Sequence, residues 1–235
     1  MTIKQITPAL LTLAVAMATS AASVAEDEFA ISGNVTMATD YVFRGQSQTL
    51  EEAAIQGGFD AEFGGFYVGT WASNVDFGTE AQAEMDFYAG YVFELTEEWS
   101  LDIGAIYFYY PGEDDVLDYQ EYVATLAWND LSFGITYSDE YLGDGGEKFF
   151  YYAVDYSIGL PSDFSLGLHV GLNKGDDQNI AFEVDPEDTY TDWSISLTKT
   201  LAAVDFALTY YDTTIDEDEN ELGEARLVFS VSKSF

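Results

Sequence analysis

The chain has 235 residues, carries 43 acidic side chains against 7 lysines and arginines, and contains no cysteine. Its net charge of −36 excludes a protein that binds nucleic acid through phosphate contacts, and the lack of cysteine excludes a fold held by disulfide bonds. The aromatic content of 16% is high, and tyrosine and phenylalanine are typical of half-buried β-strands.

The N-terminal segment has the pattern of a secretory signal peptide. Lys4 precedes an apolar run at residues 9–18, and a small-x-small cleavage sequence ends at Ala25. Such segments are removed on export, so we expect a signal peptide at residues 1–25 and one mature domain at residues 26–235. The mature sequence has no apolar run with the length of a membrane helix, so strands would have to make any membrane crossing.

The C-terminal segment, residues 224–235, alternates between polar and apolar side chains. The apolar face carries Leu227, Phe229, Val231 and Phe235. A last strand needs a permanent partner for its open edge, and the first strand of a closed barrel supplies one. A closed barrel is also the only sheet that leaves no backbone group unpaired in lipid. A soluble barrel or sandwich is the alternative.

Twelve segments show two-residue alternation, and no helical period competes with it. They are residues 29–44, 54–63, 66–76, 83–95, 99–110, 119–128, 131–141, 148–158, 164–173, 190–199, 204–213 and 224–235. Short turns such as Gly64-Gly65 alternate with longer, acidic connections. This alternation is typical of outer-membrane barrels, which have short periplasmic turns and long external loops. We therefore predict an all-β fold, a transmembrane antiparallel up-and-down β-barrel of about 12 strands in the bacterial outer membrane.

The acidic connections would form a crown at the external mouth of this barrel. Residues 111–118 read PGEDDVLD and residues 215–222 read IDEDENEL. Such a charge density attracts divalent cations weakly, whereas no loop has the spacing of an EF-hand. We expect diffuse cation attraction, no defined metal site and no cofactor.

Dense motifs occupy residues 38–91. They are DYVFRG at 40–45, SQT at 47–49, AIQGG at 54–58, WASNVDF at 71–77, and Glu84 and Asp86 before Tyr88 and Gly90-Tyr91. This third of the mature chain resembles the TorF-type porins, a family of bacterial outer-membrane proteins, although Ala53 stands where that family often has proline. The resemblance implies a porin, and it supplies neither a substrate nor catalytic residues. The terminal Phe235 resembles the signal read by outer-membrane assembly machinery, so we expect that machinery and outer-membrane lipids as partners.

Strand alternation places a set of charged side chains on the inner face of the predicted barrel. They are Asp40, Asp60, Glu62, Glu84, Asp86, Asp102, Asp155, Asp205, Arg44, Arg226 and His169. Because acids predominate, we expect a channel for passive diffusion of ions or small polar solutes that prefers cations. Barrel closure would bring Arg44 and Arg226 together as a positive patch, unless each arginine pairs with a neighbouring carboxylate.

An enzyme is not expected, and no catalytic residue is assigned. The single histidine, His169, is predicted to face inward, whereas outer-membrane phospholipases place their Ser-His pair at the lipid-facing wall. Glu84 and Asp86 suggest an omptin-like protease, but acids recur on many strands, which pore lining explains better. A non-conducting structural barrel is the remaining alternative, and a lumen narrowed by inward aromatic side chains is compatible with it.

Overall fold

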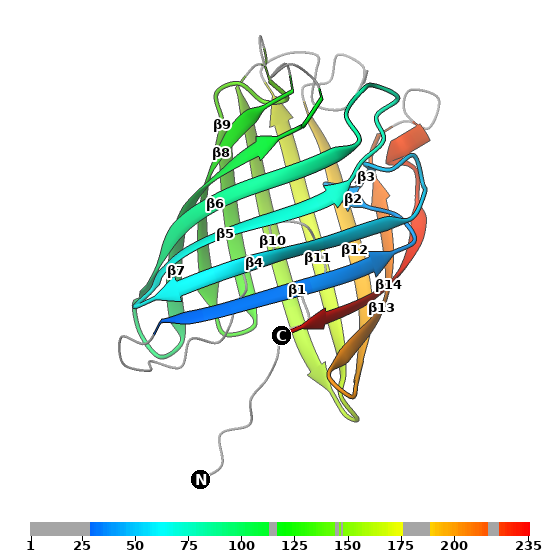
Figure 1. Ribbon diagram of the computed structural model, residues 1–235. Helices are drawn as coiled ribbons and strands as arrows, with labels where there is room; N and C mark the ends of the chain where they lie inside the picture. The colour runs from blue at the N-terminus through cyan, green and yellow to red at the C-terminus, as the bar shows by residue number, and fades with distance from the viewer. Residues whose placement is uncertain (1–28, 113–116, 144–145, 147, 176–188, 216–220) are drawn as a thin grey trace.

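The structure is a computed structural model that describes residues 29–112, 117–143, 146, 148–175, 189–215 and 221–235. Twelve strands form one closed antiparallel barrel, which confirms the predicted fold (Figure 1). The strands of the barrel are β1 (Ala30–Ala38), β4 (Ala54–Phe63), β5 (Phe66–Asn74), β6 (Ala83–Glu94), β7 (Trp99–Tyr109), β8 (Tyr119–Trp128), β9 (Leu131–Ser138), β10 (Phe149–Leu160), β11 (Phe164–Gly175), β12 (Thr189–Leu201), β13 (Val204–Thr213) and β14 (Arg226–Ser234). A short 3-10 helix, η1 (Glu221–Gly223), precedes β14.

The barrel closes where β14 pairs with β1. Met37 lies opposite Val231, and Asn34 lies opposite Ser234. The last residue continues this pairing, because the backbone groups of Gly33 and Phe235 exchange two hydrogen bonds of 2.9 Å. The first and last strands therefore leave no unpaired edge along this seam.

The apolar face of the barrel points outward. Ile31 and Met37 on β1 and Ile55 and Phe59 on β4 are exposed, while the alternating Asp60 is buried. This arrangement is the reverse of a soluble barrel, in which the apolar side chains fill the interior. Within the described residues, no helix has the length and apolar character needed to cross a membrane.

Short turns lie at the end of the barrel that holds the C terminus (Figure 1). Gly64 and Gly65 adopt φ of 53° and 89°, and Asn129 adopts φ of 50°, left-handed conformations that tight hairpin turns require. Much of the predicted acidic crown lies outside the described residues, as does the predicted signal peptide.

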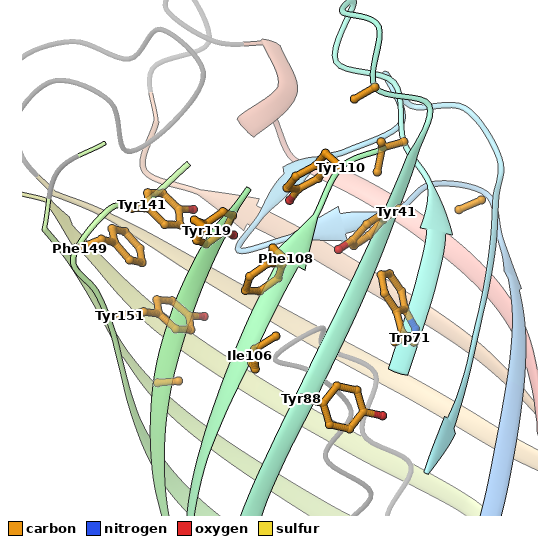
Figure 2. Packing of buried hydrophobic residues seen from close by; sticks show 14 of the residues in the cluster. Tyr41, Trp71, Tyr88, Ile106, Phe108, Tyr110, Tyr119, Tyr141, Phe149 and Tyr151 are labelled. Carbon is orange, nitrogen blue, oxygen red and sulfur yellow. The ribbon is translucent and has the colours of Figure 1, made fainter. Parts of the chain in front are cut away.

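The first strand is shorter than predicted. β1 ends at Ala38, and the chain then leaves the wall to form a two-stranded hairpin from β2 (Val42–Phe43) and β3 (Gln46–Ser47). The hairpin lies inside the barrel, where Tyr41 is 1% exposed and packs edge-on against Trp71 of β5 (Figure 2). We call residues 40–49 the inner hairpin.

The predicted first segment, residues 29–44, would have carried Tyr41 and Phe43 on the outward face with Met37, and this part of the prediction is wrong. Arg44 and Gly45 reverse the chain with φ of 48° and 81°, in the region that glycine favours. The two legs of the hairpin are joined at Asp40, whose Oδ1 accepts hydrogen bonds from Ser47 Oγ at 2.7 Å and Thr49 Oγ1 at 2.9 Å.

Candidate functional site

The inner hairpin carries Arg44 across the barrel. Its Nη1 and Nη2 donate hydrogen bonds of 2.8 Å to Oε1 and Oε2 of Glu121. Glu121 lies on β8, which is far from β1 in the strand order whichever way the ring is followed. Both side chains are buried, so this bidentate ion pair is shielded from solvent and fixes the hairpin tip against the opposite wall.

Four aromatic rings surround the Arg44 guanidinium. Its Cζ lies 4.6 Å from the ring centroids of Phe43 and Tyr151, 4.7 Å from that of Phe149 and 5.6 Å from that of Tyr141. Cation–π attraction strengthens when the ring and the cation are both desolvated, as they are here. We call these four rings and Glu121 the Arg44 cage.

The charge of Arg44 persists in this cage. Burial lowers the pKa of the guanidinium, but the Glu121 carboxylate and the neighbouring Tyr141 together raise it well above its usual value. The hairpin thus holds a permanent positive charge inside the barrel.

Two tyrosines anchor the rest of the inner hairpin. Tyr41 Oη donates to Glu84 Oε1 on β6 at 2.6 Å. Burial, followed by the Glu84 carboxylate, raises the pKa of the Tyr41 phenol well above its usual value, so the phenol remains a donor. Across the barrel, Tyr190 of β12 accepts a 2.9 Å hydrogen bond from Gln46 Nε2 and donates to the Arg44 carbonyl at 3.0 Å.

Asp86 of β6 lies opposite Trp71 of β5 and lacks a hydrogen-bond donor among the described residues. It is 0% exposed, and neither carboxyl oxygen has a partner among the described residues. Its inward neighbours on β6 are Glu84, which accepts bonds from Tyr41 and Tyr110, and Tyr88. A dry, unpartnered carboxylate is costly, so this position favours either the protonated acid or a cation placed beside it.

His169 is held between two acids. Its Nδ1 lies 2.7 Å from Asp155 Oδ1, and its Nε2 lies 2.9 Å from Asp192 Oδ1 and 2.8 Å from Tyr151 Oη. A catalytic base for a serine needs one ring nitrogen directed at the hydroxyl, with the other oriented by an acid. Here both nitrogens face carboxylates, which is the environment of a structural imidazolium.

Arg226 has a carboxylate partner of its own. Its Nη1 lies 3.0 Å from Asp40 Oδ2 and 3.5 Å from Glu51 Oε1. The expected patch of Arg44 and Arg226 is therefore wrong, because the hairpin turns inward and takes Arg44 to Glu121 on β8. Each arginine is paired, which is the alternative that the sequence left open.

The remaining predicted residues lie along the inner wall. Tyr88 Oη donates to Asp60 at 2.5 Å, Tyr67 Oη to Asp102 at 3.0 Å, and Thr200 Oγ1 to Asp205 at 2.5 Å. Glu62 is half-buried near the lower end of β4, opposite Tyr67 of β5. Whether these side chains line a path for solutes stays a prediction.

Two central acids were missed in the sequence. Asp192 alternates with Tyr190 and Ser194 along β12, and this phase should have placed it inside. Glu121 follows Tyr119 in the same way on β8, where both are buried. Alternation alone thus identifies both, although it does not predict their partners.

Comparison with known proteins gives a family and a fold. The family model described as "Bacterial protein of unknown function (Gcw_chp)" matches residues 21–235, and no curated protein matches the sequence. The NanC porin structure is 12% identical with a TM-score of 0.56, covering 86% of this chain and 98% of that chain. The KdgM porin is 13% identical with a TM-score of 0.56, covering 87% and 99%. The KdgM porin in complex with disordered oligogalacturonate is 13% identical with a TM-score of 0.51, covering 87% and 98%. These likenesses show a shared fold.

Proposed function

We propose that this chain, which belongs to the Gcw_chp family of bacterial proteins, is an outer-membrane channel. It lets ions or small polar solutes diffuse passively and prefers cations. The observation that carries this proposal is the combination of a closed barrel, an apolar outer face and an acidic inner wall. The TorF-type resemblance points the same way.

The outer face supports a location in lipid. Large apolar side chains such as Ile31, Phe59, Leu197 and Leu208 are exposed around the barrel. A continuous band of this kind is costly in water and matches the hydrocarbon layer of a membrane. Outer-membrane lipids, and the machinery that inserts barrels into them, are the partners that this surface suits.

The inner wall supports a preference for cations. Carboxylates from many strands face the lumen, whereas Arg44 and Arg226 are each neutralised by an acid. One of the similar structures is the KdgM porin in complex with disordered oligogalacturonate, which is a polyanion. An inner wall such as this one repels polyanions, so cations and neutral polar solutes are the better substrates.

The inner hairpin limits the size of what passes. Tyr41, Phe108 and Phe149 are no more than 2% exposed at its level, so side chains fill much of the lumen there. This observation also favours the second candidate, a structural barrel that does not conduct.

Conductance of the refolded mature protein in planar bilayers separates the two candidates. We expect discrete current steps and, across a KCl gradient, a reversal potential of the sign that cation preference gives. Folded barrels that insert without conducting would establish the structural barrel, and an anion-selective reversal potential would overturn the proposed selectivity. We expect neither lipid hydrolysis nor peptide cleavage by the same preparation.

A further inference from the structure

The Arg44 cage has the composition of a site that recognises organic cations. A buried carboxylate and four aromatic rings surround one guanidinium, which here belongs to the chain itself. Aromatic rings and a carboxylate are the groups that proteins use to bind guanidinium and ammonium ligands. Resting on the proposed channel function, we infer that this cage binds the guanidinium or alkylammonium group of a passing solute, and that Arg44 is its tethered occupant.

Apart from Phe43, the walls of the cage do not belong to the inner hairpin. Glu121 lies on β8, while Phe149 and Tyr151 lie on β10, so the barrel itself positions these three side chains. Tyr141 stacks on Phe149 with 3.9 Å between ring centroids. Figure 2 shows Tyr141, Phe149 and Tyr151 grouped on one side of the lumen. The site therefore persists when the Arg44 side chain leaves it.

The hairpin backbone can stay in place while the Arg44 side chain moves. Tyr190 holds the Arg44 carbonyl and the Gln46 side chain, and Asp40 holds Ser47 and Thr49. None of these bonds involves the guanidinium. A solute thus competes for the cage with one flexible side chain, without having to unfold the hairpin.

Tethering makes binding of the solute weak, as a channel requires. A side chain fixed next to its site acts as a competitor at high effective concentration. The apparent affinity of a free cation is reduced by the fraction of time that Arg44 occupies the cage. Conduction needs sites that attract a solute and release it quickly.

The geometry favours planar cations over other solutes. Glu121 presents both oxygens to two nitrogens of one guanidinium, a match that an ammonium point charge cannot reproduce. The Glu121 carboxylate that lines the cage repels solutes that carry carboxylates of their own. The cage should bind guanidinium groups most tightly, alkylammonium groups less tightly and neutral isosteres most weakly.

Chemical rescue of the full mature chain tests this inference. Arg44→Ala empties the cage and leaves Glu121 unpaired, and N-ethylguanidinium is then titrated while the Tm of the refolded protein is measured. We expect a saturable rise in Tm, with a half-maximal concentration about tenfold or more lower than in the wild-type protein, where Arg44 competes. N-ethylurea, the neutral isostere, should not raise Tm.

Arg226→Ala is the matched control. It also deprives a buried carboxylate, Asp40, of its arginine, but no aromatic ring of the described residues lies over Arg226. N-ethylguanidinium should not rescue this variant saturably, nor should it rescue the double variant Arg44→Ala, Glu121→Gln. If Arg44→Ala does not refold, the same titration is carried out on Arg44→Lys. This variant keeps the positive charge but cannot form the bidentate pair.

Equal effects of N-ethylguanidinium and N-ethylurea on a folded variant would overturn the inference. Rescue that persists without the Glu121 carboxylate would overturn it as well. Bilayer conductance distinguishes this failure from failure of the channel itself. If the protein conducts but N-ethylguanidinium does not rescue the variant, the cage is not a solute site and the channel proposal stands. If N-ethylguanidinium rescues the variant but the protein does not conduct, the cage binds cations in a barrel that is not a channel.

Discussion

Arg44 and Glu121 are 77 residues apart in the sequence and form a bidentate ion pair across the lumen, with both N–O distances at 2.8 Å. The pair joins a hairpin that leaves the wall after β1 to a strand on the distant side of the barrel. It therefore braces the hairpin tip against that wall, in addition to the hydrogen bonds that Tyr190 makes with the hairpin.

Replacing Glu121 with glutamine should loosen this brace. The substitution leaves Arg44 buried without a counter-charge, and breaking a buried pair in this way typically costs about 3–5 kcal/mol. We expect a lower Tm of the refolded protein and a larger or noisier single-channel current. Glu51→Gln is the control, because the Glu51 side chain is 61% exposed and its contact with Arg226 should contribute at most about 1 kcal/mol. Equal Tm values for the two variants would show that the hairpin does not depend on the buried pair.

Asp60→Asn should weaken cation preference. Asp60 is a buried carboxylate of the inner wall, and the asparagine oxygen can still accept the Tyr88 hydrogen bond, so the change mainly removes charge. We expect the reversal potential across a KCl gradient to move toward zero. Asp163→Asn, at an exposed turn beside Lys199, should leave it unchanged.

The same measurement at higher salt checks the electrostatic origin of the preference. The Debye length falls from about 10 Å at 0.1 M to about 3 Å at 1 M, so the field of the inner wall is screened. We expect the cation preference to fall at a fixed gradient ratio. A preference that does not change with salt would indicate selection by size, and would contradict the role given to the acids.

Most of the barrel could be predicted because one physical rule sets it. Along the barrel strands, side chains alternate between the apolar outer face and the polar inner face. The ends of β4, β8 and β13 were predicted to the residue. The inner phase was equally clear for Asp60, Asp155 and His169. What alternation cannot supply is the partner of each inner side chain.

The inner hairpin shows where this rule stops. Thr39, Tyr41 and Phe43 keep the same phase as Met37, so the pattern runs on although the wall ends at Ala38. The turn at Arg44-Gly45 is marked only by one glycine, and the contact that draws it inward is to Glu121, which no local signal reveals. The course of this segment follows from long-range contacts, of which this ion pair and the Tyr41–Glu84 hydrogen bond are two.

Gly69→Ala should displace Tyr88 from the inner wall. A Cβ at Gly69 would lie 2.4 Å from Tyr88 Cε2, so the ring must move and its bond to Asp60 is lost or weakened. Overpacking of this kind costs about 1–3 kcal/mol, which a lower Tm would register. Gly167→Ala is the matched control on β11, because its Cβ would meet only Ser196 Cβ at an ordinary 3.6 Å. The prediction fails if both variants have the wild-type Tm.

Removal of Phe235 should weaken closure of the barrel at its seam. The residue forms two backbone hydrogen bonds with Gly33, and its ring covers that glycine and meets Phe59 edge-on at 6.4 Å. Deletion removes the ring and both hydrogen bonds, each of which contributes about 0.5–1.5 kcal/mol to the free energy of unfolding. Phe235→Ala removes the ring alone. We therefore expect Tm to decrease from the wild type through Phe235→Ala to the deletion. If assembly machinery reads the aromatic side chain, both variants should also reach the outer membrane at equally reduced levels, and normal levels of Phe235→Ala would contradict that role.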